Sequence, residues 1–282
     1  QDRPARWHCK HLCLVPAAGR IAMSQVLAGL PRRSVGGVRF TIATSPQLVE
    51  AIVDSAREVS EGQGIAVHFA NAFTVALADS DPEYAALLSS PRSICLSDGF
   101  PVAWFGRRFN PDLAEQWQRV SGPETMAGVL SSAPSRSRHY LLGGSPETLA
   151  LLVANISAQW PEAIIAGSES PPFRALTADE LAAQDERVRA SGATLVWVGL
   201  GTPKQDWEVE RIAASLPVVA LAVGAAFDFI AGTKSHAPQW MRSTGLEWIY
   251  RWGSEPRRLT KRYLWGNPRF VRAALRRRTV DH

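Results

Sequence analysis

The sequence has few cysteines, no long apolar run and no repeated or low-complexity segment. Three cysteines among 282 residues are too few for the disulfide framework of a small secreted domain. No apolar stretch approaches the roughly 20 residues of a membrane-spanning helix. The first residues also lack the basic, apolar and small-residue order of a secretion signal. We therefore expect a chain that stays in the reducing cytosol and does not cross the bilayer.

Metal ligands are also scarce. Cys9 and Cys13, with His8 and His11, can be interpreted as a small metal site, but no second ligand pair follows at a matching spacing. No Asp-x-Asp pair or His/Cys/Asp cluster lies beside the glycine-rich turns described below. The sequence therefore predicts no metal site, and we expect no cofactor.

Charge is unevenly distributed along the chain. From Pro238 onward there are eleven Arg and Lys against three acidic residues, a net charge of +8. The preceding residues carry 20 basic and 23 acidic side chains, a net charge of −3. An acidic body with a basic tail indicates that the tail meets an anionic partner, either lipid head groups or nucleic acid.

From Ser34 onward, segments typical of strands and helices alternate. Buried β-branched runs that alternate with helices predict a parallel sheet covered on both faces, a Rossmann-like α/β body. We expect a poorly ordered stretch at 1–33, this body at 34–233 and a helical basic and aromatic appendage at 234–282. The expected strands are 38–44, 65–71, 93–99, 138–144, 194–201 and 218–229, and the expected helices are 45–59, 72–88, 146–160 and 205–216.

Two glycine turns follow expected strands, at the sheet edge where such folds bind ligands. Gly143 and Gly144 precede Ser145, a helix cap, so that free backbone N–H groups there suit a phosphate. An ordinary strand-to-helix turn explains the same residues. Gly199 and Gly201 form the second turn.

Gln205 lies beside this second turn and offers amide donors and an acceptor to sugar hydroxyls or phosphate. On the alternative interpretation, Thr202 and Asp206 only cap the next helix.

Two carboxylates also follow apolar strands. Asp98 is placed where a general base would take the proton from an acceptor hydroxyl, although Asp-Gly is also an ordinary turn. Asp228 can accept from a ribose hydroxyl or a base edge, or cap a turn. Arg119 is a candidate to neutralise a diphosphate leaving group, unless it is a solvated surface cation.

The tail places Trp240, Trp248, Trp252 and Trp265 among its cations. This composition is typical of a helix at a membrane interface. It is also compatible with base stacking on single-stranded nucleic acid, or with packing against the body.

Together these segments resemble the WecG/TagA/CpsF glycosyltransferases, family 26, over roughly Gly36 to Val271. The resemblance rests on HFANAF, SDG at 97–99, RVSGPE, LLGG, GTPKQDWE, VGAAFDFIAG and GLEWIYRWGSEPRRLTKRYLWGNPRF. It implies a metal-independent, inverting enzyme that adds the second or a later sugar to an undecaprenyl-diphosphate-linked saccharide. N-acetylmannosamine, its uronic acid and glucose are the candidate sugars.

The same resemblance implies Asp98 as the catalytic base and Arg119 and Gln205 as pocket residues, with Asn71 and Asp228 nearby. Where family members carry Thr and Glu around the second strand, this chain has Phe69 and Phe73, which affects donor or acceptor preference. We expect binding of a UDP-sugar and a polyprenyl-diphosphate-linked saccharide at the cytoplasmic face of an anionic membrane.

Two other functions fit parts of the sequence. A non-catalytic nucleotide-sugar sensor would keep the cleft without needing Asp98, and turnover distinguishes it from an enzyme. A nucleic-acid-binding protein would use the basic tail and show a steep salt dependence. We expect no nucleic-acid partner, because the glycine-turn strands prepare a small-molecule cleft that this function would leave unused.

Overall fold

The computed structural model describes residues 25–59, 64–132, 137–235, 237–238, 240–241, 244 and 246–276. Residues 1–24, most of the stretch expected to be poorly ordered, lie outside this range. Residues 25–33 contain a short helix and the start of a strand, so the boundary expected at residue 34 falls within the first strand.

The centre of the molecule is an eight-stranded sheet in the order β1-β2-β4-β3-β8-β7-β5-β6. Every strand pair is parallel except the β1–β2 hairpin. The Rossmann-like α/β prediction is therefore confirmed. The strands are β1 Arg32–Val35, β2 Val38–Thr41, β3 Ile65–Ala70, β4 Ser93–Ser97, β5 Arg138–Gly143, β6 Ile164–Glu169, β7 Leu195–Gly199 and β8 Val219–Ala222.

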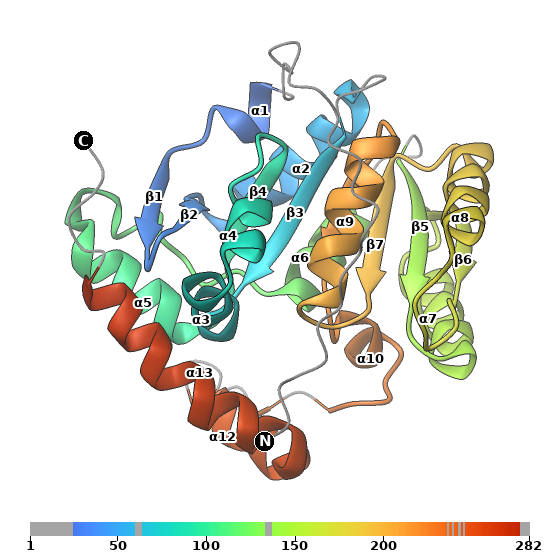
Figure 1. Ribbon diagram of the computed structural model, residues 1–282. Coiled ribbons are helices and arrows are strands. Elements are labelled where there is room, and N and C mark those ends of the chain that lie inside the picture. The colour runs from blue at the N-terminus through green and yellow to red at the C-terminus, as the bar shows by residue number, and fades with distance from the viewer. Residues whose placement is uncertain are drawn as a thin grey trace.

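Helices cover both faces of the sheet (Figure 1). Side chains of α2, α6, α7 and α10 pack on one face, and those of α3, α4, α8 and α9 pack on the other. The helices are α1 Gln25–Ala28, α2 Ser45–Glu58, α3 Ala72–Ser80, α4 Pro82–Leu88, α5 Phe100–Phe109, α6 Gly122–Ser132, α7 Pro146–Gln159, α8 Ala178–Ser191, α9 Lys204–Ser215, α10 Ala226–Ile230, α12 Glu247–Ser254 and α13 Pro256–Arg276, with a 3₁₀ turn at Pro111–Leu113.

Two expected elements were wrong in extent. The helix expected over 72–88 is two helices, because Asp81 ends α3 and its carboxylate caps α4, with Pro82 at the first position. The strand expected over 218–229 ends at Ala222, and the rest forms a turn and α10. Asp228 therefore lies in a short helix rather than directly after a strand.

A buried polar network fixes α9 against the sheet. His68 Nδ1 on β3 lies 3.0 Å from Asp206 Oδ1, and the Tyr84 hydroxyl donates to Asp206 Oδ2 at 2.8 Å. All three side chains are buried, and burial followed by the Asp206 charge raises the pKa of Tyr84 well above its usual value. The N-cap residue of α9 is Pro203, and no side chain caps this helix, contrary to the capping interpretation of Thr202 and Asp206.

The appendage packs on the body as helices α12 and α13, which Figure 1 shows along the outer edge of the molecule beside α3 and α5. Phe270, Ala273 and Ala274 of α13 are buried, and the Phe270 ring lies 5.4 Å from that of Phe105 on α5. Core packing therefore accounts for one face of the tail. Within the described residues, every helix is too short or too polar to span a bilayer.

Candidate functional site

Backbone contacts bring three predicted residues to the carboxyl ends of β3 and β4. Asp98 donates its backbone N–H to Ala70 at the end of β3, and Val120 donates its N–H to Ser97 at the end of β4. Gly99 is a neighbour of the Asn71 side chain, because a Cβ added to Gly99 would lie in ordinary contact with the Asn71 Cβ, at 4.0 Å. Asn71, Asp98 and Arg119 are therefore brought together at this edge.

Asp98 lies in the short connection between β4 and α5. Gly99 has φ 88°, a left-handed conformation that turns the chain sharply after the carboxylate and into the helix. Asp98 is half-buried and interacts electrostatically with Arg119. A carboxylate at the end of a buried strand, beside a cation, is placed as a general base would be.

Arg119 connects the body to the appendage. Its Nη1 donates to Glu247 Oε2 of α12 at 2.6 Å, and its Nη2 lies 3.5 Å from Glu124 Oε1. The Arg119 side chain is 22% exposed. Burial lowers the pKa of Arg119, but the hydrogen bond and charge of Glu247 more than offset this, so the net shift is upward. The guanidinium is therefore a permanent cation near Asp98, not a solvated surface group.

Asn71 has a structural role alongside its predicted one. Its Oδ1 caps α3 by accepting from the backbone N–H groups of Phe73 and Thr74. Arg262 of α13 also donates to this oxygen, at 3.3 Å, and its guanidinium lies 4.2 Å from the centre of the Phe73 ring. The aromatic residue in place of the family acid thus holds an appendage arginine by a cation–π contact.

The glycine turns allow close backbone approach. A Cβ on Gly143, which has φ 125°, would lie 2.6 Å from the Gly199 carbonyl oxygen, and a Cβ on Gly199 would lie 2.8 Å from the Phe227 ring. Ser145 caps α7, as predicted, by accepting from the Thr148 N–H. These contacts show why glycine is required at the ends of β5 and β7.

Gln205 is buried and binds backbone groups. Its Oε1 accepts from the Gly201 N–H at 2.9 Å, and its Nε2 donates to the Ala222 carbonyl at 2.8 Å. Gly224, two residues after the end of β8, approaches the same amide. The amide expected to contact sugar or phosphate thus has one N–H left for that purpose. Its observed role is to hold together the turns after β7 and β8.

Asp228 forms a second bridge to the appendage. Lys234 Nζ lies 2.9 Å from Asp228 Oδ2 and 3.0 Å from Glu255 Oε1, directly after α12. The backbone carbonyl of Asp228 also accepts from Thr233 and Lys234. The carboxylate is 31% exposed, so a ribose hydroxyl would have to share it with Lys234.

The residues that sequence reasoning missed come mainly from the appendage. Glu247 pairs with Arg119 of the body near Asp98, and Glu255 pairs with Lys234, which also binds Asp228, while Arg262 reaches Asn71. No local signal in the sequence indicated these contacts, because Arg119 and Glu247, like Asn71 and Arg262, are more than 100 residues apart in the chain.

Within the described residues, no three His, Cys, Asp or Glu side chains converge as metal ligands. His8, Cys9, His11 and Cys13 lie outside that part of the chain.

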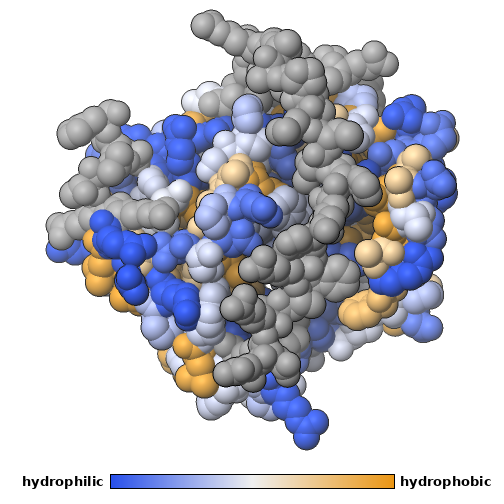
Figure 2. Space-filling view, viewed as in Figure 1, coloured by the Kyte–Doolittle hydropathy of each residue, from blue (hydrophilic) through white to orange (hydrophobic). Residues whose placement is uncertain are grey.

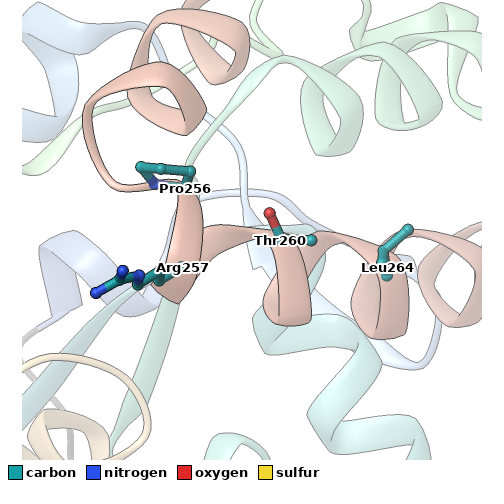
Figure 3. A pocket seen from close by; sticks show the side chains of 4 residues that line it. All are labelled: Pro256, Arg257, Thr260 and Leu264. Carbon is teal, nitrogen blue, oxygen red and sulfur yellow. The ribbon is translucent and has the colours of Figure 1, made fainter.

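A separate hollow of about 640 Å³ lies on the appendage, lined by Pro256, Arg257, Thr260 and Leu264. Figure 3 shows Thr260 and Leu264 on the same side of α13. The lining residues include neither Asp98 nor Asp228, so this hollow is distinct from the strand-end site.

One comparison with known proteins bears on this site. The model of the glycosyl transferase WecG/TagA/CpsF family matches residues 33–281. The match therefore covers the sheet, the strand-end site and the appendage.

Proposed function

Since the chain belongs to the WecG/TagA/CpsF family of glycosyl transferases, we propose that it moves a sugar from a UDP-sugar to a polyprenyl-diphosphate-linked saccharide, with inversion. The family indicates a glycosyltransferase of cell-surface polysaccharide biosynthesis, and the donor, acceptor and stereochemistry are the parts we propose. The observation that carries them is the position of a carboxylate, Asp98, near a fixed cation, Arg119, at the carboxyl edge of the sheet.

In the proposed reaction, a hydroxyl oxygen of the acceptor attacks the anomeric carbon of the donor sugar. Asp98 takes the hydroxyl proton as the new carbon–oxygen bond forms. The bond from the anomeric carbon to the β-phosphate oxygen breaks, and its electron pair leaves with UDP. A single displacement of this kind inverts the anomeric carbon.

Arg119 would meet the charge that develops on the leaving diphosphate. Its five N–H groups allow one edge to bind Glu247 while another faces the diphosphate. The α7 N-terminus behind Gly143 and Gly144 supplies backbone N–H groups of the kind that bind phosphate. Gln205 would act by holding the turns around Gly201.

A lipid-linked acceptor would be met at a membrane surface, and the exposed side of the appendage supports this part of the proposal. Figure 2 shows hydrophobic and hydrophilic side chains next to each other along this edge of the molecule. Such a mixture suits an anionic interface, with rings at the acyl boundary and cations at the head groups. The exposed apolar and cationic residues of α12 and α13 include Trp248, Ile249, Trp252, Arg257, Leu264, Arg269, Val271, Arg272, Leu275 and Arg276.

The test is a donor screen read by mass spectrometry. UDP-activated N-acetylmannosamine, its uronic acid and glucose are each offered with a short-chain polyprenyl-diphosphate disaccharide. We expect one donor to give a product larger by one sugar, with release of UDP and the opposite anomeric configuration. UDP-sugar binding without transfer to this acceptor would contradict the proposal and favour a nucleotide-sugar sensor.

A further inference from the structure

Helix α5 begins two residues after Asp98 and carries an exposed stripe. Phe100, Trp104 and Arg108 are four residues apart and therefore lie along one side of the helix. Phe100 is 40% exposed and Trp104 is 47% exposed, and Arg108 is exposed as well. At 1.5 Å per residue, the stripe extends about 12 Å from Phe100 to Arg108.

Packing of the fold does not account for this stripe. The buried side of α5 is formed by Val102, Ala103 and Gly106. Contact with the appendage comes from another flank, where Phe105 packs against Phe270. Trp104 touches the Phe105 ring edge-on, with centroids 4.9 Å apart, and keeps almost half of its surface in solvent. Large exposed aromatic residues beside a site are typical of ligand contact.

Arg108 adds a charge at the far end of the stripe. Among the described residues no carboxylate forms an ion pair with it, whereas neighbouring Arg107 donates to the carbonyl of Ala103 in its own helix. A cation in the last helical turn is also favoured by the helix dipole. The arginine alone therefore does not indicate a ligand. Its position in line with two aromatic rings and a base does indicate a ligand-binding surface.

We propose that Phe100, Trp104 and Arg108 bind the saccharide and the diphosphate of the acceptor, so that α5 is the acceptor subsite. This inference rests on the proposed function. The order of groups along the helix is a base, two rings and a guanidinium. The order in the acceptor is the attacking hydroxyl, its sugar rings and the diphosphate.

The spacing supports this match. Trp104 follows Phe100 by about 6 Å along the helix axis, comparable to the repeat of one pyranose unit. The C–H faces of sugars stack on aromatic rings, and a guanidinium binds diphosphate oxygens with paired hydrogen bonds. The lipid chain would then leave the protein beyond Arg108.

The experiment measures transfer to a short-chain, water-soluble polyprenyl-diphosphate disaccharide without vesicles. Trp104→Ala should raise the acceptor KM about 3- to 10-fold, and Trp104→Tyr should restore most of the loss. Arg108→Gln should raise the KM about tenfold. The donor KM should stay unchanged in each case. Arg107→Gln is the matched control, because it removes the same charge from the same helix off the stripe, and it should leave both KM values unchanged.

A second acceptor locates the diphosphate. With an alkyl glycoside of the same disaccharide, Arg108→Gln should have no effect while Trp104→Ala still raises the KM. Equal effects of Arg107→Gln and Arg108→Gln would overturn the diphosphate assignment. Unchanged acceptor KM in Trp104→Ala, with loss of sedimentation on anionic vesicles, would make the stripe a membrane contact and overturn the proposal.

Binding separates this inference from the proposed function. Isothermal titration of the disaccharide diphosphate to wild-type protein and to the Trp104→Ala and Arg107→Gln variants needs no turnover. Binding weakened only in Trp104→Ala supports the acceptor subsite even if no UDP-sugar is used. Equal binding by all three proteins contradicts the subsite even if the donor screen succeeds.

Discussion

The guanidinium of Arg119 and the carboxylate of Glu247 lie 2.6 Å apart, although 128 residues separate them in the chain. Both side chains are about three-quarters buried. The same guanidinium interacts electrostatically with Asp98. The first turn of α12 therefore fixes a cation at the strand-end site, and this contact is one route by which a change in the appendage reaches the site.

Glu247→Gln should lower kcat/KM for the donor about tenfold, since a charge-assisted hydrogen bond that orients Arg119 becomes a neutral one. Hydrogen exchange of 247–254 should also become faster. Glu124→Gln is the control, because the ion pair of Glu124 with the same guanidinium is longer, at 3.5 Å, and weaker, since Glu124 is 50% exposed. Equal losses in the two variants would show that Glu247 has no special role in orienting Arg119.

Asp98→Asn should reduce turnover roughly 10²–10⁴-fold while UDP binding and folding persist, because the amide cannot accept the hydroxyl proton. Steady-state kinetics and titration calorimetry with UDP measure the two properties separately. Turnover close to that of the wild-type protein would remove Asp98 as the base.

Activity should survive EDTA, and Arg119→Ala should raise the donor KM, because Arg119 and helix N-termini are proposed to meet the diphosphate charge. The Asp79-Ser80-Asp81 sequence has the spacing of a metal-binding pair. However, Asp79 pairs with Arg276 at 2.5 Å and Asp81 caps α4. Loss of activity on chelation that manganese reverses would contradict this account.

A double variant, Leu264→Asn and Val271→Asn, should sediment less with phosphatidylglycerol vesicles. Its transfer of sugar to a short soluble acceptor should stay intact. These side chains are 74% and 41% exposed. Phe270→Ala is the contrasting variant, because Phe270 is 2% exposed and its loss should cost about 3–5 kcal/mol of unfolding free energy. Deleting 260–282 would combine the two effects. Undiminished vesicle binding by the double variant would count against the membrane role.

Stability should fall as the pH drops from 6.5 toward 4. Burial lowers the pKa of His139 to about 4, and its Nδ1 accepts from Trp197 Nε1 at 3.0 Å. Between this value and the ordinary one, the unfolded chain binds the extra proton, so acid favours unfolding. Urea midpoints at pH 7, 5.5 and 4.5 measure the effect. His139→Gln should flatten the profile, and an unchanged slope would assign the acid sensitivity to other groups.

Much of the fold could be predicted because long apolar runs and helix caps are local signals. The two unexpected strands lack such signals. Residues of β6 are only partly buried and include Gly167, which packs on the Tyr140 ring, while β1 begins with two arginines. Asp81-Pro82 is a local signal for the break between α3 and α4, but the apolar residues continue at helical spacing across it and so favour one helix.

The candidate site was less predictable, since its interactions join distant parts of the chain. Nothing local shows that Gln205 binds the backbone of Ala222, or that Arg262 rests on Phe73. Asp98 and Gly143 lie at the carboxyl ends of β4 and β5, and local patterns do indicate where those strands lie in the sequence. Their substrate roles remain predictions for the variants above.

The position of β8 has a consequence for how the chain folds. Among the described residues β8 is the last strand in sequence, yet it lies between β3 and β7, and no other described strand joins β1–β4 to β5–β7. Until residue 222 has been synthesised, the two half-sheets each have an unpaired inner edge, and such edges invite aggregation. Pairing Val67 with Leu221 closes a loop of more than half the chain, so we expect slow, late joining of the halves.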